Sequence, residues 1–104
     1  PSIEVKKVEI QDINRGMIDE EVRIDCVVSD VKASASKSSY FLTINDGTGQ
    51  MSLIIFESQL AQLEDNGIDV ESYKGKKVNV AGTVTEYNSQ LELILSSGDA
   101  IKIV

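Results

Sequence analysis

Apolar and polar residues alternate along three stretches in the first half of the chain, with the period of strands that bury one face. In residues 21–31 one side carries Val22, Ile24, Cys26 and Val28. Residues 40–45 and 50–56 alternate in the same way around DGTG, whose Asp and two glycines favour a tight hairpin turn. The returning strand is expected to turn Met51, Leu53 and Ile55 inward and Ser52, Ile54 and Phe56 outward.

The second half of the chain begins with a change of period. Leu60 and Leu63 stand at helical spacing and Asn66-Gly67 follows as a stop signal, which predicts a short helix over about 58–65. Residues 76–87 and 91–95 alternate again and are joined by the short turn NSQ, and residues 100–104 form a last extended segment. The small polar residues of KASASKSS, 32–39, predict a loop between the first two long strands.

Two of the predicted strands carry a similar pattern. VRIDCVVSDV (22–31) and VNVAGTVTEY (78–87) match at most positions, and each has a small residue at its centre, Cys26 or Gly82. A small residue in the middle of a strand suits a bend or a close backbone approach. Two long bent strands predict a sheet that curls and closes on itself.

Composition fits one folded domain without catalytic machinery. The 104 residues are 41% hydrophobic and 26% charged, with one cysteine and no histidine. The lone Cys26 excludes an internal disulfide, and the missing histidines remove the usual general base and most transition-metal sites. No apolar run approaches the length of about 18 residues that a transmembrane helix needs. We therefore expect no enzymatic activity, no cofactor, no metal and no membrane span.

The order strand, strand, strand, helix, strand, strand belongs to the five-stranded Greek-key barrel called the OB-fold. The segments V-x-I-x-C-x-V, YFLTINDGTGQMSLIIF and YKGKKVNVAGTV resemble OB-fold nucleic-acid-binding domains. The resemblance is to the single-stranded-DNA-binding domains of replication protein A and to anticodon-binding-type OB domains. It implies an all-β fold with one short helix between strands 3 and 4. We expect a single domain over 1–104, with a leading strand and turn in 1–20, the barrel in 21–95 and a terminal strand in 100–104.

In the family that the chain resembles, the ligand lies across strands 2 and 3, between the loops that join strands 1–2 and 4–5. Here those loops are KASASKSS and YNSQ. Phe56, ten residues after the turn residue Asp46, takes the position of a base-stacking aromatic in the family. The resemblance and the strand parity together imply that nucleic acid contacts Arg23, Lys32, Lys37, Phe41, Thr43, Ser52, Ile54, Phe56, Tyr87 and Asn88.

Two departures from the family and the net charge of −7 predict weak binding. Ser52 stands where the family often has a basic residue, and Leu91 stands where an aromatic is common. Asp30, Glu86 and Glu92 border the expected site and would repel phosphates. We expect micromolar or weaker, largely sequence-independent binding of single-stranded DNA or RNA, strengthened by tandem OB domains or a larger parent protein.

A different function is compatible with the same fold, because OB domains also bind proteins. An exposed Ile54 between Phe41 and Phe56 would suit a protein partner, for example in an accessory domain of a secreted lipoprotein. Self-association through an open strand edge is a third hypothesis. A replication-type domain would be cytoplasmic and a lipoprotein-type domain extracellular.

Overall fold

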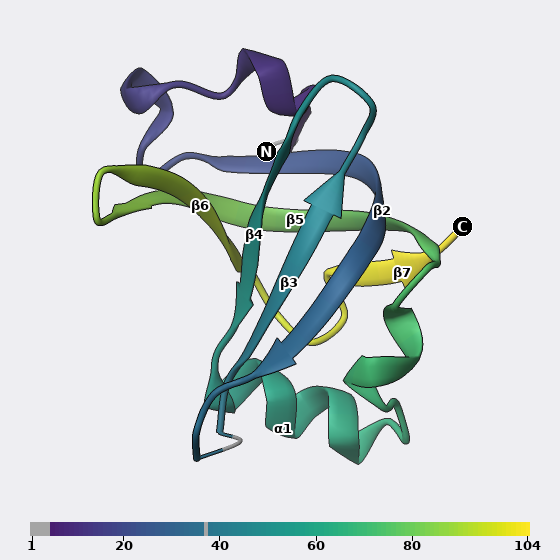
Figure 1. Ribbon diagram of the computed structural model, residues 1–104. Helices are drawn as coiled ribbons and strands as arrows, with labels where there is room; N and C mark the ends of the chain where they lie inside the picture. Colours follow the sequence, from purple (N-terminus) through teal and green to yellow (C-terminus); the bar gives the residue numbers. More distant parts are fainter. Residues whose placement is uncertain (1–4, 37) are drawn as a thin grey trace, which may run out of the picture.

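Five strands hydrogen-bond in a closed ring in the computed structural model, which describes residues 5–36 and 38–104 (Figure 1). These strands are β2 (Glu21–Ala33), β3 (Tyr40–Asn45), β4 (Gln50–Ile55), β5 (Lys77–Tyr87) and β6 (Gln90–Leu95). They pair in the order β2-β3-β4-β6-β5, and a further pairing of β5 with β2 closes the barrel. Only the β4–β6 contact within this ring is parallel. The predicted five-stranded barrel is confirmed.

Short elements extend the barrel at its edges and one end. The helix α1 (Glu57–Asp65) lies between β4 and β5, as predicted, and covers one end of the barrel (Figure 1). The 3₁₀ turn η3 (Val70–Tyr73) leads from it to β5. Strand β1 (Lys6–Lys7) pairs parallel to β2, and β7 (Ile101–Ile103) pairs with β5. No helix among the described residues is long and apolar enough to cross a membrane.

The leading segment is more irregular than the expected strand and turn. After β1 it forms two 3₁₀ turns, η1 (Ile10–Asp12) and η2 (Arg15–Met17). The side chain of Asp46, in the β3–β4 turn, fastens this segment to the barrel. Its Oδ2 accepts the backbone N–H of Ile10 at 2.8 Å, and its Oδ1 accepts the backbone N–H of Thr48 at 2.9 Å. Asp46 therefore serves both the tight turn and the packing of the leading segment.

The barrel interior holds the apolar residues that alternation placed inward. The side chains of this core include Val22, Ile24, Val28, Leu42, Ile44, Leu53, Ile55, Val78, Val80, Val84, Leu93 and Leu95, all at most 1% exposed. Leu60 of α1 and Tyr73 of η3 complete the same cluster. Met51, also assigned inward, and Tyr40 are half-buried and pack against it. Because each strand alternates between core and surface, the outer face of the barrel is fixed as well.

The two long strands bend where they change partners. Gly82 pairs with Val22 of β2 and with Leu95 of β6, and a Cβ placed on it would lie 2.6 Å from the backbone oxygen of Ile94. The close approach expected at Gly82 is thus confirmed. In β2 the bend lies elsewhere than predicted. The register shifts between Val28 and Asp30, so a bulge at Ser29 bends the strand, while Cys26 is an ordinary core residue.

Candidate functional site

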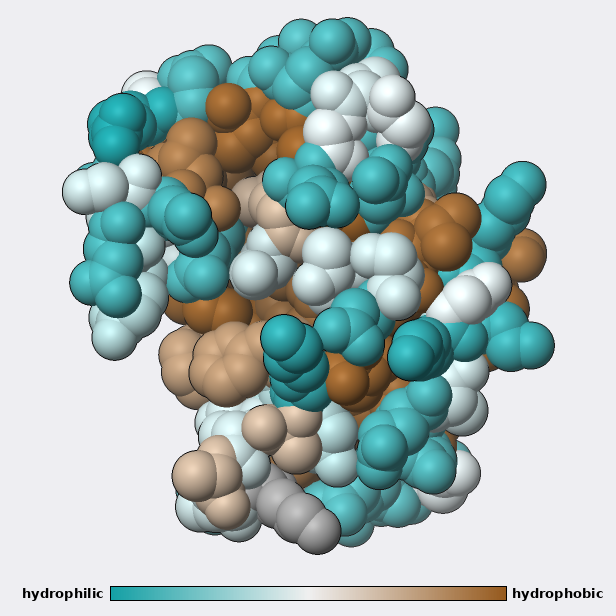
Figure 2. Space-filling view, viewed as in Figure 1, coloured by the Kyte–Doolittle hydropathy of each residue, from teal (hydrophilic) through white to brown (hydrophobic). Residues whose placement is uncertain are grey.

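An apolar groove of about 380 Å³ lies on the outer surface of the barrel, between the β3–β4 strands and the β5–β6 hairpin. We call it the aromatic groove; it is lined by Phe41, Ile54, Phe56, Thr85, Glu86, Tyr87, Glu92 and Ile94. The chain has three Tyr and two Phe. Phe41, Phe56 and Tyr87 are 41%, 44% and 66% exposed, and all three line this groove. The space-filling view shows apolar surface left open among hydrophilic groups on this side of the molecule (Figure 2).

Strand register explains why these side chains meet. Phe41 stands directly opposite Ile54 across the β3–β4 ladder, and Phe56 follows Ile54 by two positions. Side chains of directly paired residues, and of residues two apart, project from the same face of a sheet. The β4–β6 pairing places Ile94 beside Ile54, and Tyr87 comes from the end of β5. Four strands thus contribute to one surface.

Ile54 differs from the expectation of an exposed apolar centre. It is only 7% exposed, although it faces outward and does not belong to the core cluster inside the barrel. The reason is its position in the sheet, since its neighbours across the ladders are Phe41 and Ile94. Ile54 therefore forms the floor of the groove, beneath the exposed rings.

A second, polar hollow of about 510 Å³ adjoins the same strands nearer the hairpin turns. We call it the polar groove; it is lined by Arg15, Thr43, Gln50, Met51, Ser52, Ser89, Gln90 and Leu91. Thr43 and Ser52, both predicted site residues, face each other across the β3–β4 ladder here. The two grooves together bring Phe41, Thr43, Ser52, Ile54, Phe56 and Tyr87 onto one side of the barrel.

Arg15 is a cation at this site that sequence reasoning missed. It projects from η2, and its Nε donates to Oε2 of Glu86 at 2.5 Å while Nη2 donates to the backbone oxygen of Ser89 at 3.2 Å. These contacts tie the leading segment to the tip of the β5–β6 hairpin. Arg15 lies 71 positions from Glu86 in the chain, so no local pattern signals the contact.

The hairpin tip is shaped by two residues with left-handed backbone. Asn88 has φ 50° and Ser89 has φ 65°, as a two-residue turn between twisted strands requires. Asn88 is exposed in this turn but lines neither groove, whereas the adjacent Tyr87 lines the aromatic groove. Asn88, predicted to contact nucleic acid, thus stands next to the aromatic groove at the hairpin tip without lining it.

The structure places the basic residues predicted at the site differently from one another. Lys32 is exposed and stands opposite Phe41 across the β2–β3 ladder, so it borders the aromatic groove. Lys37 lies outside the described residues. The structure does not bring Arg23 to the groove. Arg23 lies on the other half of β2, where it pairs with Ala81 of β5 and donates to the side chain of Asn79. The bulge at Ser29 separates this half of β2, which pairs with β5, from the end that pairs with β3.

Two of the three acids near the site have a cation partner. Arg15 pairs with Glu86, and Lys74 lies 3.9 Å from a carboxylate oxygen of Asp30. Within residues 5–36 and 38–104, Glu92 has no ion pair or side-chain hydrogen bond. The aromatic groove therefore combines exposed rings with one carboxylate whose charge is not offset by a described neighbour.

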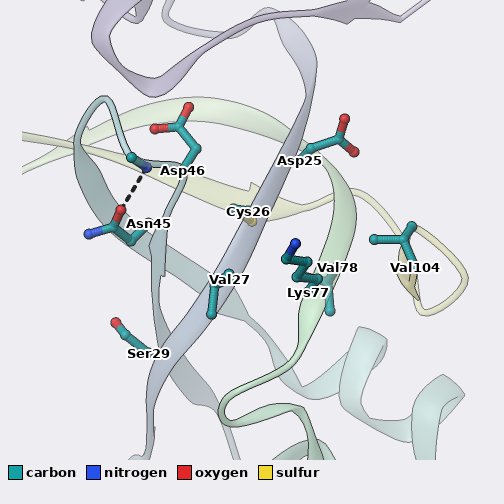
Figure 3. A pocket seen from close by; sticks show the side chains of 10 residues that line it. Asp25, Cys26, Val27, Ser29, Asn45, Asp46, Lys77, Val78 and Val104 are labelled. Atoms are coloured by element: carbon teal, nitrogen blue, oxygen red, sulfur yellow. Dashed lines mark hydrogen bonds between the residues drawn. The ribbon is translucent and has the colours of Figure 1, made fainter.

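A third hollow, of about 590 Å³, lies elsewhere on the barrel, between β2, the β3–β4 turn and the start of β5 (Figure 3). Cys26 and Asp25 line it, with Lys77 and Val104. Burial, together with the charges of Asp46 and Asp25, raises the pKa of the Cys26 thiol to about 12, so the thiol is inert. A hydrogen bond from Lys7 and another from Asn79 lower the pKa of Asp25. Among the described residues no three His, Cys, Asp or Glu side chains gather as metal ligands would.

Comparison with known proteins gives one family match and several similar structures. A family model described as an OB-fold nucleic acid binding domain matches residues 3–98. A search of curated protein sequences finds no match. Aspartyl-tRNA synthetase from Entamoeba histolytica is 18% identical with a TM-score of 0.77, over 95% of this chain and 21% of that protein. The chain thus spans about a fifth of the synthetase.

Two further structures share the fold at similar identity. An OB domain from Methanosarcina mazei is 15% identical with a TM-score of 0.75, over 98% of this chain and 86% of that domain. A replication protein A heterotrimer bound to single-stranded DNA is 18% identical with a TM-score of 0.58, over 81% of this chain and 57% of that chain. At these identities the likeness concerns the barrel and its connections.

Proposed function

The chain belongs to the family of OB-fold nucleic acid binding domains, and we propose that it binds single-stranded nucleic acid along the aromatic and polar grooves. The observation that carries this proposal is the convergence of Phe41, Phe56 and Tyr87, all exposed, on one groove. Exposing three aromatic side chains to water is unfavourable unless a ligand covers them. Every base has a π-face, so stacked rings can bind single strands of many sequences.

Two of the three rings come from regular elements of the barrel, which supports a stacking role. Phe41 belongs to β3, and Phe56 is the N-cap residue of α1, where its side chain makes no capping hydrogen bond. Each stacked base contributes roughly 1–3 kcal/mol by alanine substitution. Thr43 and Ser52 in the adjoining polar groove offer hydroxyls to phosphates or base edges.

The charges around the grooves predict weak and salt-sensitive binding. Among the described residues, the cations beside the grooves are Arg15 and Lys32, and Arg15 already pairs with Glu86. With about 0.7 units of slope for each phosphate neutralised on a single strand, Arg15 and Lys32 together would contribute about −1.4 to the salt dependence of log K. We expect micromolar or weaker affinity for this domain alone.

Weak binding fits a module that works within a larger assembly. A second nucleic-acid-binding domain on the same chain or complex would raise the effective concentration and so the overall affinity. We infer a non-catalytic role, because the buried Cys26 is inert and the chain has no histidine. Burial of Ile54 removes one of the features that favoured the protein-docking alternative.

The test is fluorescence anisotropy with labelled single-stranded DNA and RNA of mixed sequence, at low and at physiological salt. Phe56→Ala should weaken binding about 5-fold or more, because one stacked base is lost. Ile103→Ala is the matched control, since Ile103 is an exposed apolar residue of β7 and lines neither groove. It should bind as the wild type does.

The outcomes separate clearly. Salt-sensitive binding that Phe56→Ala weakens and Ile103→Ala leaves unchanged would support the stacking groove. An absence of binding at low salt and high protein concentration would overturn the proposal, as would equal losses in both variants.

A further inference from the structure

Glu92 occupies an unusual position for an acid in a nucleic-acid groove. It lies on β6, two positions before Ile94, and lines the aromatic groove with Phe41 and Phe56. Glu86, the other acid there, is paired with Arg15, whereas Glu92 has no ion pair among the described residues. An ionised carboxylate accepts hydrogen bonds and donates none. It will therefore attract amino groups and repel phosphate and carbonyl oxygens.

We propose that Glu92 reads the edge of a base stacked in the aromatic groove and favours cytosine over thymine or uracil; this rests on the proposed function. The exocyclic amino group of cytosine is a donor that Glu and Asp accept. Thymine presents a carbonyl oxygen at the same position, and uracil does likewise. The carboxylate would bind the amino group of cytosine and repel the carbonyl oxygen of thymine or uracil. The domain would therefore select among pyrimidines, although base stacking alone does not distinguish them.

The order of strands across the groove supports this orientation of the ligand. The outward side chains run from Lys32 on β2, through Phe41 on β3 and Ile54 on β4, to the β6 wall, where Glu92 stands beside Ile94. On the β2 side the carboxylate of Asp30 is offset by Lys74, which leaves the charge of Lys32. On the β6 side Arg15 pairs with Glu86, which leaves the carboxylate of Glu92. Phosphates are favoured on the β2 side and repelled on the β6 side. A strand bound with its backbone near Lys32 directs its bases across the rings toward Glu92.

The spacing along β6 suits such a contact. Residues two apart on a strand are separated by about 6.7 Å, so Glu92 stands beyond the apolar floor that Ile54 and Ile94 form. A base over this floor keeps its face on apolar groups and its edge toward the carboxylate. The partly buried position of Glu92 also strengthens the hydrogen bond relative to one in open water.

The experiment compares two pyrimidine homopolymers, oligo-dC and oligo-dT of about 12 nucleotides, a length within the range of OB-fold sites. Anisotropy titrations at low salt and pH 8 measure the ratio of their dissociation constants. The wild type should bind oligo-dC at least about 5-fold more tightly, the low end of discrimination by a base-edge contact. Glu92→Gln should bring the ratio close to one, because a glutamine amide also donates to carbonyl oxygens.

Glu71→Gln is the control for the loss of one negative charge. Glu71 is exposed in η3 and lines neither groove, so this variant should keep the preference for oligo-dC. Equal binding of the two oligonucleotides by the wild type, or a preference that Glu92→Gln retains, would overturn the inference and leave the proposed function standing. Failure of the wild type to bind either would overturn both.

Discussion

Gly82 is a position where adding a single methyl group should damage this barrel severely. An alanine Cβ there would lie 2.6 Å from the backbone oxygen of Ile94 and 2.6 Å from Cγ of Leu93. A flexible side chain can move away from such a contact, but a backbone oxygen within a sheet cannot. Overpacking of this kind typically costs 1–3 kcal/mol, and we expect Gly82→Ala to lose about 3 kcal/mol of unfolding free energy.

That loss is large against the total of about 5–15 kcal/mol that holds a domain folded. With a urea m-value of about 1.5 kcal/mol/M, the midpoint of unfolding followed by far-UV circular dichroism should fall by about 2 M. Gly67→Ala is the control, because Gly67 has φ +73° and no atom within 4 Å of its added Cβ. Gly67→Ala should lose only the roughly 1–2 kcal/mol of unfolding free energy that a non-glycine residue costs in a left-handed backbone conformation. A Gly82→Ala midpoint at or above that of Gly67→Ala would refute the argument from close packing.

Two further predictions concern titrating groups. Burial raises the pKa of Asp46, but hydrogen bonds from Thr48, Ile10 and Gly49 together outweigh it and lower the pKa below 3.8. The contribution of Asp46 to the free energy of unfolding is therefore present above about pH 4 and is lost as pH falls through the lowered pKa. Urea midpoints measured from pH 7 to pH 3 should fall less steeply in Asp46→Asn than in the wild type; equal slopes would contradict this. The raised pKa of Cys26, about 12 against an ordinary 9.0, predicts reaction with a thiol reagent at least about 10-fold slower in the native protein than in denaturing urea, and comparable rates would contradict it.

Alternation predicted the barrel strands because each of them buries one face against a single core. Val22, Ile24 and Val28 were placed inward by parity alone, and all three are buried. The helix was predicted to within one residue at its start, since its apolar spacing and its Asn66-Gly67 stop are local signals. The two 3₁₀ turns before β2 were not predicted. The first of them, η1, is held by Asp46, which accepts the N–H of Ile10 from 36 positions away.

The alternation of positions along the strands also predicted which side chains face outward at the site, but not how deeply each is buried. Phe41 and Phe56 were predicted on one face and line one groove. The same reasoning made Ile54 exposed, which is wrong, because parity says which face a residue occupies and nothing about what covers it. Arg23 was assigned by parity as well, but it lies on the half of β2 that pairs with β5, on the other side of the bulge at Ser29 from the groove.

The sequence placed Tyr87 and Glu92 near the site, but the position of their wall of the groove depends on how far the sheet bends, which alternation does not give. Tyr87 and Glu92 reach the outer face of β3 and β4 because β5 passes from β2 to β6 at Gly82, where the strands approach too closely for a Cβ. Arg15 reaches the same region through its contact with Glu86 near the far end of that hairpin. Packing at Gly82 and the shape of the groove are therefore one structural property. A substitution that relieved the close approach would also move the wall that carries Glu92 away from the rings.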